Sequence, residues 1–405
     1  MEKNILPIKK AVLIFFVFAS GYFLSCLLRA ITATLSPLLT DEFNLLAGDL
    51  GLLAGGYFLG FASMQIPLGY LLDRHGPKKI VSSFLLIAII GTTAFALAQS
   101  FAGLIISRIL IGVGVSACLM GPLTGYRIWF ADEYQQRGNS WMLMIASSGF
   151  VFSTLPVQIL LPIFGWRWIF GGISILIFIV IILTLLFIPP WKKEIDNNDQ
   201  KNSGLLSDIW KNKFFRSTIP LGLFNYGGIM AVQTLWAGPW MVRVSGHDPL
   251  ESATGLFWIN ATMLIAFFVW GYILPKINKL GMDTMKLLKF GLPISYLSLF
   301  VIIISGENVG AIHFIIYILT SIVLSLTQPA VAMHFPTSLA GKSLTSFNLL
   351  IFLGTFIMQW GIGLIIDLSK YLGKGETQSF QISFAVYLII CILSYSYFIL
   401  KNRNE

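Results

Sequence analysis

The segment GYLLDRHGPKK, from Gly69 to Lys79, decides the fold because it places loop-forming and charged residues between two long apolar runs. The runs cover residues 49–72 and 80–99, and a helix needs about 20 mostly apolar residues to cross a bilayer. One arginine and two lysines within the segment are typical of a short cytoplasmic loop. The segment therefore predicts two neighbouring membrane helices that are joined on the inside.

The composition puts the whole chain in the same class. Of its 405 residues, 56% are hydrophobic and only 11% are charged, where a soluble domain has about 25% charged residues. These figures exclude a soluble enzyme, a disordered chain and a disulfide scaffold. Cys26, Cys118 and Cys391 lie inside apolar runs at no metal-ligand spacing, so we interpret them as packing residues. We expect a polytopic membrane protein without metal or cofactor.

Twelve apolar runs of spanning length follow one another along the chain. They cover roughly residues 11–39, 49–72, 80–99, 101–124, 141–163, 167–189, 217–243, 253–275, 287–305, 311–334, 343–367 and 380–400. The first run follows Lys9 and Lys10, as in a signal peptide, but it is too long and lacks an A-x-A cleavage site. We therefore expect it to be retained as the first span.

The net charge of +9 is a signal of membrane topology. With a cytoplasmic N-terminus, 21 of the 27 lysines and arginines fall in cytoplasmic segments and four on the opposite side, and this bias sets orientation. The four on the opposite side are Arg167, Arg243, Lys370 and Lys374. We expect both termini inside, in a plasma membrane of the bacterial inner-membrane type. Because the cations are spread over many short loops, the charge does not indicate a nucleic-acid site.

One long polar segment, which contains KKEIDNNDQKNSG, divides the chain into two sets of six spans. The predicted organisation is an N-terminal six-helix bundle at 1–189, a cytoplasmic loop at 190–216 and a C-terminal six-helix bundle at 217–405. A weak repeat supports the division, because LPKINKLGMDTMK follows span eight as GYLLDRHGPKK follows span two. Two similar halves around a central site are typical of secondary transporters.

In its motifs the chain resembles the major facilitator superfamily. The family's loop motif, G-x-L-x-D-R-x-G-x-[RK]-[RK], is present as Gly69, Leu71, Asp73, Arg74, Gly76, Lys78 and Lys79. The pattern R-x-x-x-G-x-G in span four is present as Arg108, Gly112 and Gly114, and GWRWIF before span six is also similar. The resemblance covers the whole chain. It implies an all-α fold of twelve helices in two pseudo-symmetric bundles, and a transporter that works by alternating access rather than an enzyme.

The resemblance also implies a role for the loop as a gating latch between the halves. Asp73 ends one helix, and a carboxylate is stabilised at the positive N-terminus of another. In this family the partner is span eleven, which begins here near Leu344. The alternative is that Arg74, Lys78 and Lys79 only anchor the loop in the cytoplasm.

Arg29 and Arg108 lie inside apolar runs, where a charged side chain is costly and usually functional. Both are expected about 10–15 Å below the outer surface, at 1.5 Å of rise per residue. The 18 acids fall in loops and at span ends, so a substrate can supply the countercharge. Arginine suits bidentate recognition of carboxylate or phosphate. For Arg108 the alternative is the family's common fourth-span arginine, held by backbone carbonyls.

This pair of arginines resembles the organic-anion transporters of the superfamily, although those usually keep a membrane carboxylate that is missing here. Polar residues that could complete a site between spans one, four and seven are Tyr57, Gln65, Asn225, Tyr226, Gln233 and Trp236. Asn260, Gln328, Asn348 and Gln359 extend the set, and each of these could instead bridge helices. His313, which corresponds to Arg108 in the repeat, is the candidate for proton coupling.

The sequence thus predicts a secondary transporter, expected as a monomer, for a small organic anion such as a carboxylate- or phosphate-bearing metabolite. We expect uptake by proton symport or exchange. Transport of an amino acid, peptide or other zwitterion is an alternative, since its carboxylate would use the same arginines. Drug efflux by an antiporter is the other alternative, but span five lacks the G-x-x-x-G-P motif. A membrane enzyme is disfavoured, because no nucleophile with a paired base or buried acidic cluster is apparent.

Overall fold

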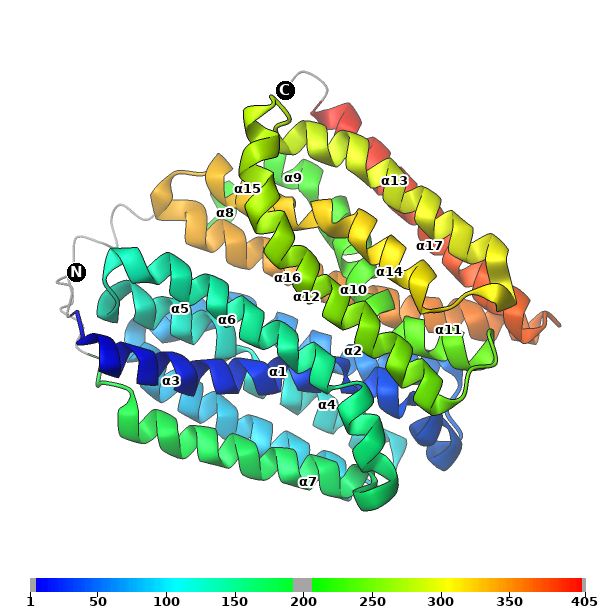
Figure 1. Ribbon diagram of the computed structural model, residues 1–405, viewed down its shortest axis with the longest axis horizontal. Helices are drawn as coiled ribbons and strands as arrows, with labels where there is room; N and C mark the ends of the chain where they lie inside the picture. The colour runs from blue at the N-terminus through cyan, green and yellow to red at the C-terminus, as the bar shows by residue number, and fades with distance from the viewer. Residues whose placement is uncertain (1–4, 192–205, 403–405) are drawn as a thin grey trace. The chain divides into compact units, whose positions relative to one another are not determined.

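A computed structural model describes residues 5–191 and 206–402, and within these residues the regular secondary structure is entirely helical (Figure 1). Long apolar runs form these helices because a backbone in a membrane must satisfy its own hydrogen bonds. Residues 192–205, which are most of the predicted central loop, lie outside the described residues.

The first six predicted spans correspond to seven helices. They are α1 (Ile8–Phe43), α2 (Ala47–Ser63), α3 (Gln65–Leu97), α4 (Phe101–Val115), α5 (Ala117–Trp129), α6 (Asp132–Phe152) and α7 (Leu155–Phe187). Spans four and five are each interrupted by a short break. Span two consists of α2 and the first part of α3. Each of the six spans predicted in this half is helical, as the predicted twelve-helix, two-bundle fold requires.

The second half follows the predicted order as well. Its elements are α8 (Leu206–Lys211), α9 (Lys213–Pro220), η1 (Leu221–Tyr226), α10 (Gly227–Ala231), η2 (Val232–Trp236), α11 (Ala237–Arg243), α12 (Pro249–Lys279), α13 (Thr284–Ser305), η3 (Gly306–Asn308), α14 (Ala311–Thr320), η4 (Ser321–Leu326), α15 (Thr327–His334), α16 (Thr337–Tyr371) and α17 (Glu376–Lys401). Span seven contains two π-helical segments, η1 and η2, and span ten contains the 3₁₀ segment η4. Such irregular turns within helices frequently mark functional sites.

Nine of the helices in the described part of the chain are long and apolar enough to cross a membrane by length and composition. This number is smaller than twelve because two of them, α3 and α7, each join two spans across a reversing glycine. Gly76 (φ 79°) and Gly165 (φ 73°) have non-helical backbone angles inside these helices. Span seven is missing from the nine because it is divided into short segments.

Gly76 is a position that only glycine can occupy. Its φ of 79° with ψ of 163° lies in a region of backbone space that is essentially restricted to glycine. A Cβ atom there would also lie 2.2 Å from Cγ of Trp191, whose side chain packs onto the turn. The motif glycine therefore allows the chain to reverse between spans two and three, with Trp191 covering the turn.

Replacing Gly76 with alanine is expected to destabilise the protein by about 1–3 kcal/mol, because the residue must hold a strained backbone angle and displace Trp191. Gly69 is the matched control, since it lies inside α3 and a Cβ atom there would have no neighbour within 4 Å among the described residues. Gly69→Ala should leave stability unchanged or raise it slightly, because alanine favours helix. Thermal unfolding of the two purified variants would measure this difference, and equal melting temperatures would contradict the role of Gly76 in the turn.

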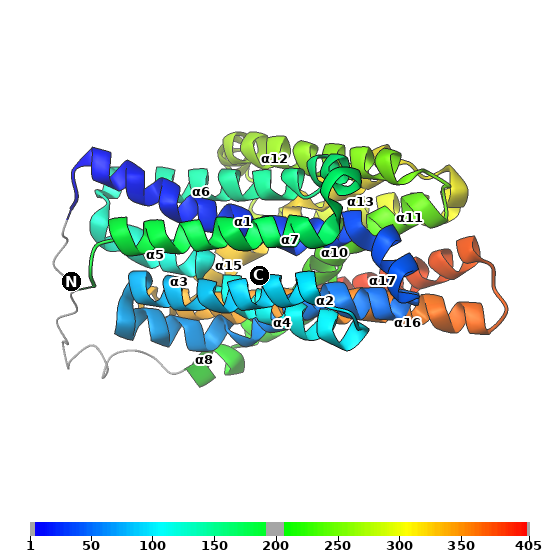
Figure 2. The same cartoon turned by 90° about the horizontal axis from the view of Figure 1, so that it is seen from below.

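The chain divides into two compact units that do not coincide with a single cut in the sequence. Unit 1 contains residues 1–31 and 56–201, and unit 2 contains 32–55 and 202–405. Within unit 1, α3 packs against α4, α5 and α7, and Figure 2 shows these helices running alongside one another. Within unit 2, a core of large apolar side chains surrounds Trp236 and Trp240.

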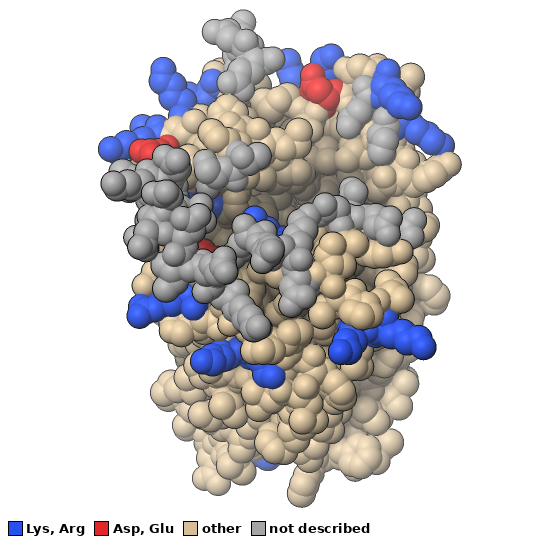
Figure 3. Space-filling view, turned by 90° about the vertical axis from the view of Figure 1, so that its left-hand side faces the viewer, with Lys and Arg blue, Asp and Glu red and all other residues tan. Residues whose placement is uncertain are grey.

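Lysines and arginines are frequent, and acidic side chains are few, on the face that Figure 3 shows. Three of the four cations predicted on the opposite side have identified contacts. Arg243 and Lys370 both pair with Glu376, and the guanidinium of Arg167 lies 4.2 Å from the ring centroid of Trp166.

Candidate functional site

Arg29 and Arg108 meet at one aromatic ring in unit 1. The guanidinium carbon of Arg29 lies 5.9 Å from the ring centroid of Tyr57, and that of Arg108 lies 5.6 Å from the same centroid. The three residues come from α1, α2 and α4, and they are almost fully buried, with 5%, 0% and 0% exposure for Arg29, Tyr57 and Arg108. Two positive charges therefore converge on one tyrosine inside the bundle.

Hydrogen bonds to α1 hold the tyrosine and the second arginine in place. The Tyr57 hydroxyl donates to the backbone oxygen of Ser25 at 3.0 Å and lies 3.1 Å from the Ser25 hydroxyl. One turn further along α1, the backbone oxygen of Leu28 accepts from Nη1 of Arg108 at 2.8 Å. Arg108 thus has the backbone-carbonyl contact that the sequence allowed as its alternative role, and it still faces Tyr57.

Arg29 lies among aromatic rings. Its guanidinium carbon is 5.1 Å from the Phe61 centroid and 5.8 Å from the Phe150 centroid, besides the contact with Tyr57. Neither phenylalanine was among the residues predicted from the sequence. Phe61 had a usable signal, because it lies four residues after Tyr57 and therefore on the same face of α2. Phe150 had none, since nothing in the sequence of span five indicates which phenylalanine turns inward.

Glycines bring α2 and α4 close enough for this arrangement. A Cβ at Gly112 would lie 2.0 Å from the backbone oxygen of Tyr57, and one at Gly60 would lie 2.1 Å from the backbone oxygen of Ile109. Small residues at membrane-helix interfaces allow such backbone contact. The glycine four residues after Arg108 in the span-four pattern therefore sets the distance between Arg108 and Tyr57.

Gln65, the other candidate on span two, makes its hydrogen bond elsewhere. Its side-chain amide donates to the backbone oxygen of Phe61 at 3.3 Å, a contact within its own span. Although Gln65 is buried, the bond that it makes is local to the junction of α2 and α3.

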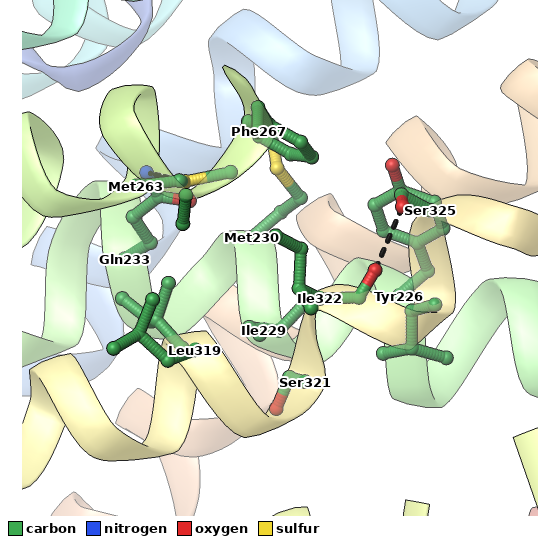
Figure 4. A pocket seen from close by; sticks show the side chains of 13 residues that line it. Tyr226, Ile229, Met230, Gln233, Met263, Phe267, Leu319, Ser321, Ile322 and Ser325 are labelled. Carbon is green, nitrogen blue, oxygen red and sulfur yellow. Dashed lines mark hydrogen bonds between the residues drawn. The ribbon is translucent and has the colours of Figure 1, made fainter. Parts of the chain in front are cut away.

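In unit 2, two of the four candidates on span seven line a pocket. Tyr226 and Gln233 border it, with η1, α10 and η2 on one side and α12, α14 and η4 around the rest. Figure 4 shows Met230, Met263 and Phe267 beside them, so the lining is mainly apolar and rich in methionine. The side-chain amide of Gln233 donates to Oδ1 of Asn260 at 2.9 Å, so Asn260 lies next to this pocket residue.

The other two span-seven candidates connect helices. The Asn225 amide donates to the hydroxyl of Ser394, and its oxygen accepts from Tyr296 at 2.7 Å. The Trp236 indole donates to the backbone oxygen of Gln359 at 3.1 Å. These contacts tie span seven to spans nine, eleven and twelve, which is the bridging role that the sequence left open. Gln328 and Asn348 likewise bond to each other, at 2.6 Å.

His313 lies in the first turn of α14. Its Nδ1 accepts a hydrogen bond from the backbone N–H of Gly310 at 3.1 Å, and the side chain is half-buried. This contact satisfies a donor that the helix terminus would otherwise leave without a partner. The structure therefore gives His313 a capping role at the helix start.

Comparisons with known proteins agree with this architecture. A family model described as Major Facilitator Superfamily matches residues 18–359. The curated protein "Probable sulfoacetate transporter SauU" of Cupriavidus necator is 24% identical over an alignment of 247 residues, which covers 56% of this chain and 56% of the relative. The chain therefore spans about half the length of this curated relative.

Solved structures match over nearly the whole chain. A bacterial homologue of the human lysosomal transporter Spinster superposes with a TM-score of 0.77 at 14% identity, covering 98% of both chains. A D-xylose–proton symporter gives a TM-score of 0.79 at 14% identity, covering 96% of this chain and 97% of the other. At these identities the likeness is one of fold.

Proposed function

The chain belongs to the Major Facilitator Superfamily and is a multi-pass membrane transporter rather than an enzyme, and we propose that it moves a small organic anion by alternating access. The substrate's carboxylate or phosphate binds at Arg29 and Arg108. The observation that carries the proposal is the convergence of both guanidinium groups on the Tyr57 ring.

The two arginines have different roles in this proposal. Arg108 is oriented by the Leu28 carbonyl and supplies a positive charge of constant position. Arg29 lies against the rings of Tyr57, Phe61 and Phe150. We assign it the contact with the anion, because the planar guanidinium suits bidentate recognition of carboxylates and phosphates.

The relative named as a probable sulfoacetate transporter supports the class of substrate. Sulfoacetate carries a carboxylate and a sulfonate, which are anionic groups of the kind that guanidinium groups bind. At 24% identity and partial coverage this relative supports the chemistry of the substrate class and not its identity. The related proposal is uptake, by proton symport or exchange, in a plasma membrane of the bacterial inner-membrane type with both termini inside.

A thermal-shift screen of the purified protein tests the substrate class. A ligand that binds only the folded state stabilises it by about 2.7 kcal/mol at a concentration a hundred times its Kd. We expect carboxylates, sulfonates or phosphates to raise the melting temperature, and cationic drugs to leave it unchanged. Stabilisation by cationic or neutral compounds alone would overturn the proposal and favour efflux.

A further inference from the structure

A carboxylate of span eleven caps the start of span two. Oδ1 of Asp367, near the end of α16, accepts from the backbone N–H of Ala47 at 3.0 Å, and Oδ2 accepts from that of Gly48 at 2.6 Å. Ala47 and Gly48 are the first residues of the 17-residue helix α2. The acceptor thus lies 319 and 320 residues away from its donors in the chain.

This contact has a clear electrostatic basis. The first N–H groups of a helix have no partner within the helix, and the helix dipole makes its N-terminus favourable for a negative charge. Bonds from N–H groups to an ionised carboxylate are stronger than neutral ones. Lys370, on the next turn of α16, is paired with Glu376 and so does not compete for the Asp367 carboxylate.

Glycines allow the two helices to approach closely on the same side. A Cβ at Gly51 would lie 2.3 Å from the backbone oxygen of Gln359, and one at Gly363 would lie 2.3 Å from the backbone oxygen of Ala47. A Cβ at Gly48 would lie 2.8 Å from the Asp367 carboxylate itself. The carboxylate therefore belongs to a tight helix–helix contact that extends over several turns.

The division into units shows what this contact holds together. Residues 32–55, the end of α1 and the start of α2, group with the C-terminal helices in unit 2, whereas the rest of α1 and α2 belongs to unit 1. The predicted topology places residues 32–55 at the outer side. The Asp367 contact is thus where the outer ends of spans one and two attach to span eleven.

We propose that Asp367 and the N-terminus of α2 form an outer latch, which keeps the outer end of the transporter closed and must break for that end to open. The proposal rests on the proposed transport function and orientation. It is the counterpart of the inner latch expected from Asp73, which lies at the inner end of span two and is expected to pair with the start of span eleven. Each of the two spans then carries an acid that caps the other, at opposite ends.

The two latches should alternate, because opening one end requires the other to close. Asp73 is exposed, and the described residues make no hydrogen bond or ion pair to it. Breaking the Asp367 contact should therefore favour an outward-open form, and removing the Asp73 carboxylate should disfavour it.

Thiol labelling from the outside tests the outer latch. Ala54 is 2% exposed in the core of unit 2, so a cysteine there reports opening of this contact region. We expect Asp367→Asn to raise the rate at which a membrane-impermeant maleimide labels Ala54→Cys about tenfold. The free energy of a hydrogen bond to a charged acceptor is large enough to change an equilibrium by about this factor. Asp73→Asn in the same background should lower the rate.

The matched control is Asp49→Asn. Asp49 also lies in the first turn of α2, but its carboxylate accepts from the backbone N–H of Leu46 within the same segment, at 3.1 Å. This variant should label at the parent rate. Equal labelling in the Asp367→Asn variant and its parent would overturn the latch, and so would an equal increase in the Asp49→Asn variant. The assay needs no substrate, so failure of the anion proposal would not alter its result.

Discussion

Arg29→Ala should reduce uptake of the anionic substrate about a hundredfold or more while the protein remains folded in the membrane. Truncating one partner of a buried, hydrogen-bonded charge pair costs about 2–5 kcal/mol, and every 1.4 kcal/mol is a factor of ten. The loss should appear in substrate affinity, because the arginine is proposed to bind the anion and not to move a proton. Uptake into vesicles, with the amount of protein in the membrane measured in parallel, gives the result.

Two further variants separate charge from geometry. Arg29→Lys keeps the positive charge but loses the planar fork of donors, so it should retain part of the activity. Arg216→Ala removes an exposed arginine just before span seven and should transport normally. Normal kinetics in Arg29→Ala would show that the arginine only packs against Tyr57, Phe61 and Phe150.

Gly112→Ala should prevent normal folding or severely lower thermal stability. The added methyl group would lie 2.0 Å from the backbone oxygen of Tyr57, and backbone cannot move aside as a flexible side chain can. Overpacking of this kind typically costs about 1–3 kcal/mol, and more where backbone must move. Because the displaced segment carries Tyr57, the variant should also transport poorly even where some protein folds.

Gly171→Ala is the control for this second prediction. Gly171 also lies inside a spanning helix, α7, and an added Cβ would meet nothing within 4 Å in the part of the chain that the structure describes. It should melt at or slightly above the temperature of the parent protein, because alanine favours helix over glycine. If the Gly112→Ala and Gly171→Ala variants have the same melting temperature, α2 and α4 are less tightly packed than the structure describes.

The spans and the buried arginines were predictable from the sequence. The twelve spans follow from composition and run length alone, since a bilayer imposes one length scale on every helix. The arginines follow for the same reason, because a charge inside an apolar run is conspicuous in any sequence. Tyr57 was among the candidates, but its place between the two guanidinium groups was not foreseeable.

The sequence could not tell which polar residues of span seven line a pocket and which bridge helices. Asn225 and Tyr226 are adjacent, yet Asn225 bonds to Tyr296 and Ser394 while Tyr226 lines a pocket. The π-helical segments change the direction of side chains by a fraction of a turn, which a regular period of 3.6 residues does not predict. Candidates chosen from such a span therefore include both lining and bridging residues.

By itself, the sequence determined the membrane class, the number and order of spans, the family resemblance and the two intramembrane arginines. These depend on local composition and spacing, which the linear chain carries directly. Only the tertiary structure decided that both arginines face Tyr57, that Gly112 lets α4 approach Tyr57 closely, and that Asp367 caps α2. Each of these is a contact between residues far apart in the chain, and its geometry depends on how closely two helix backbones approach.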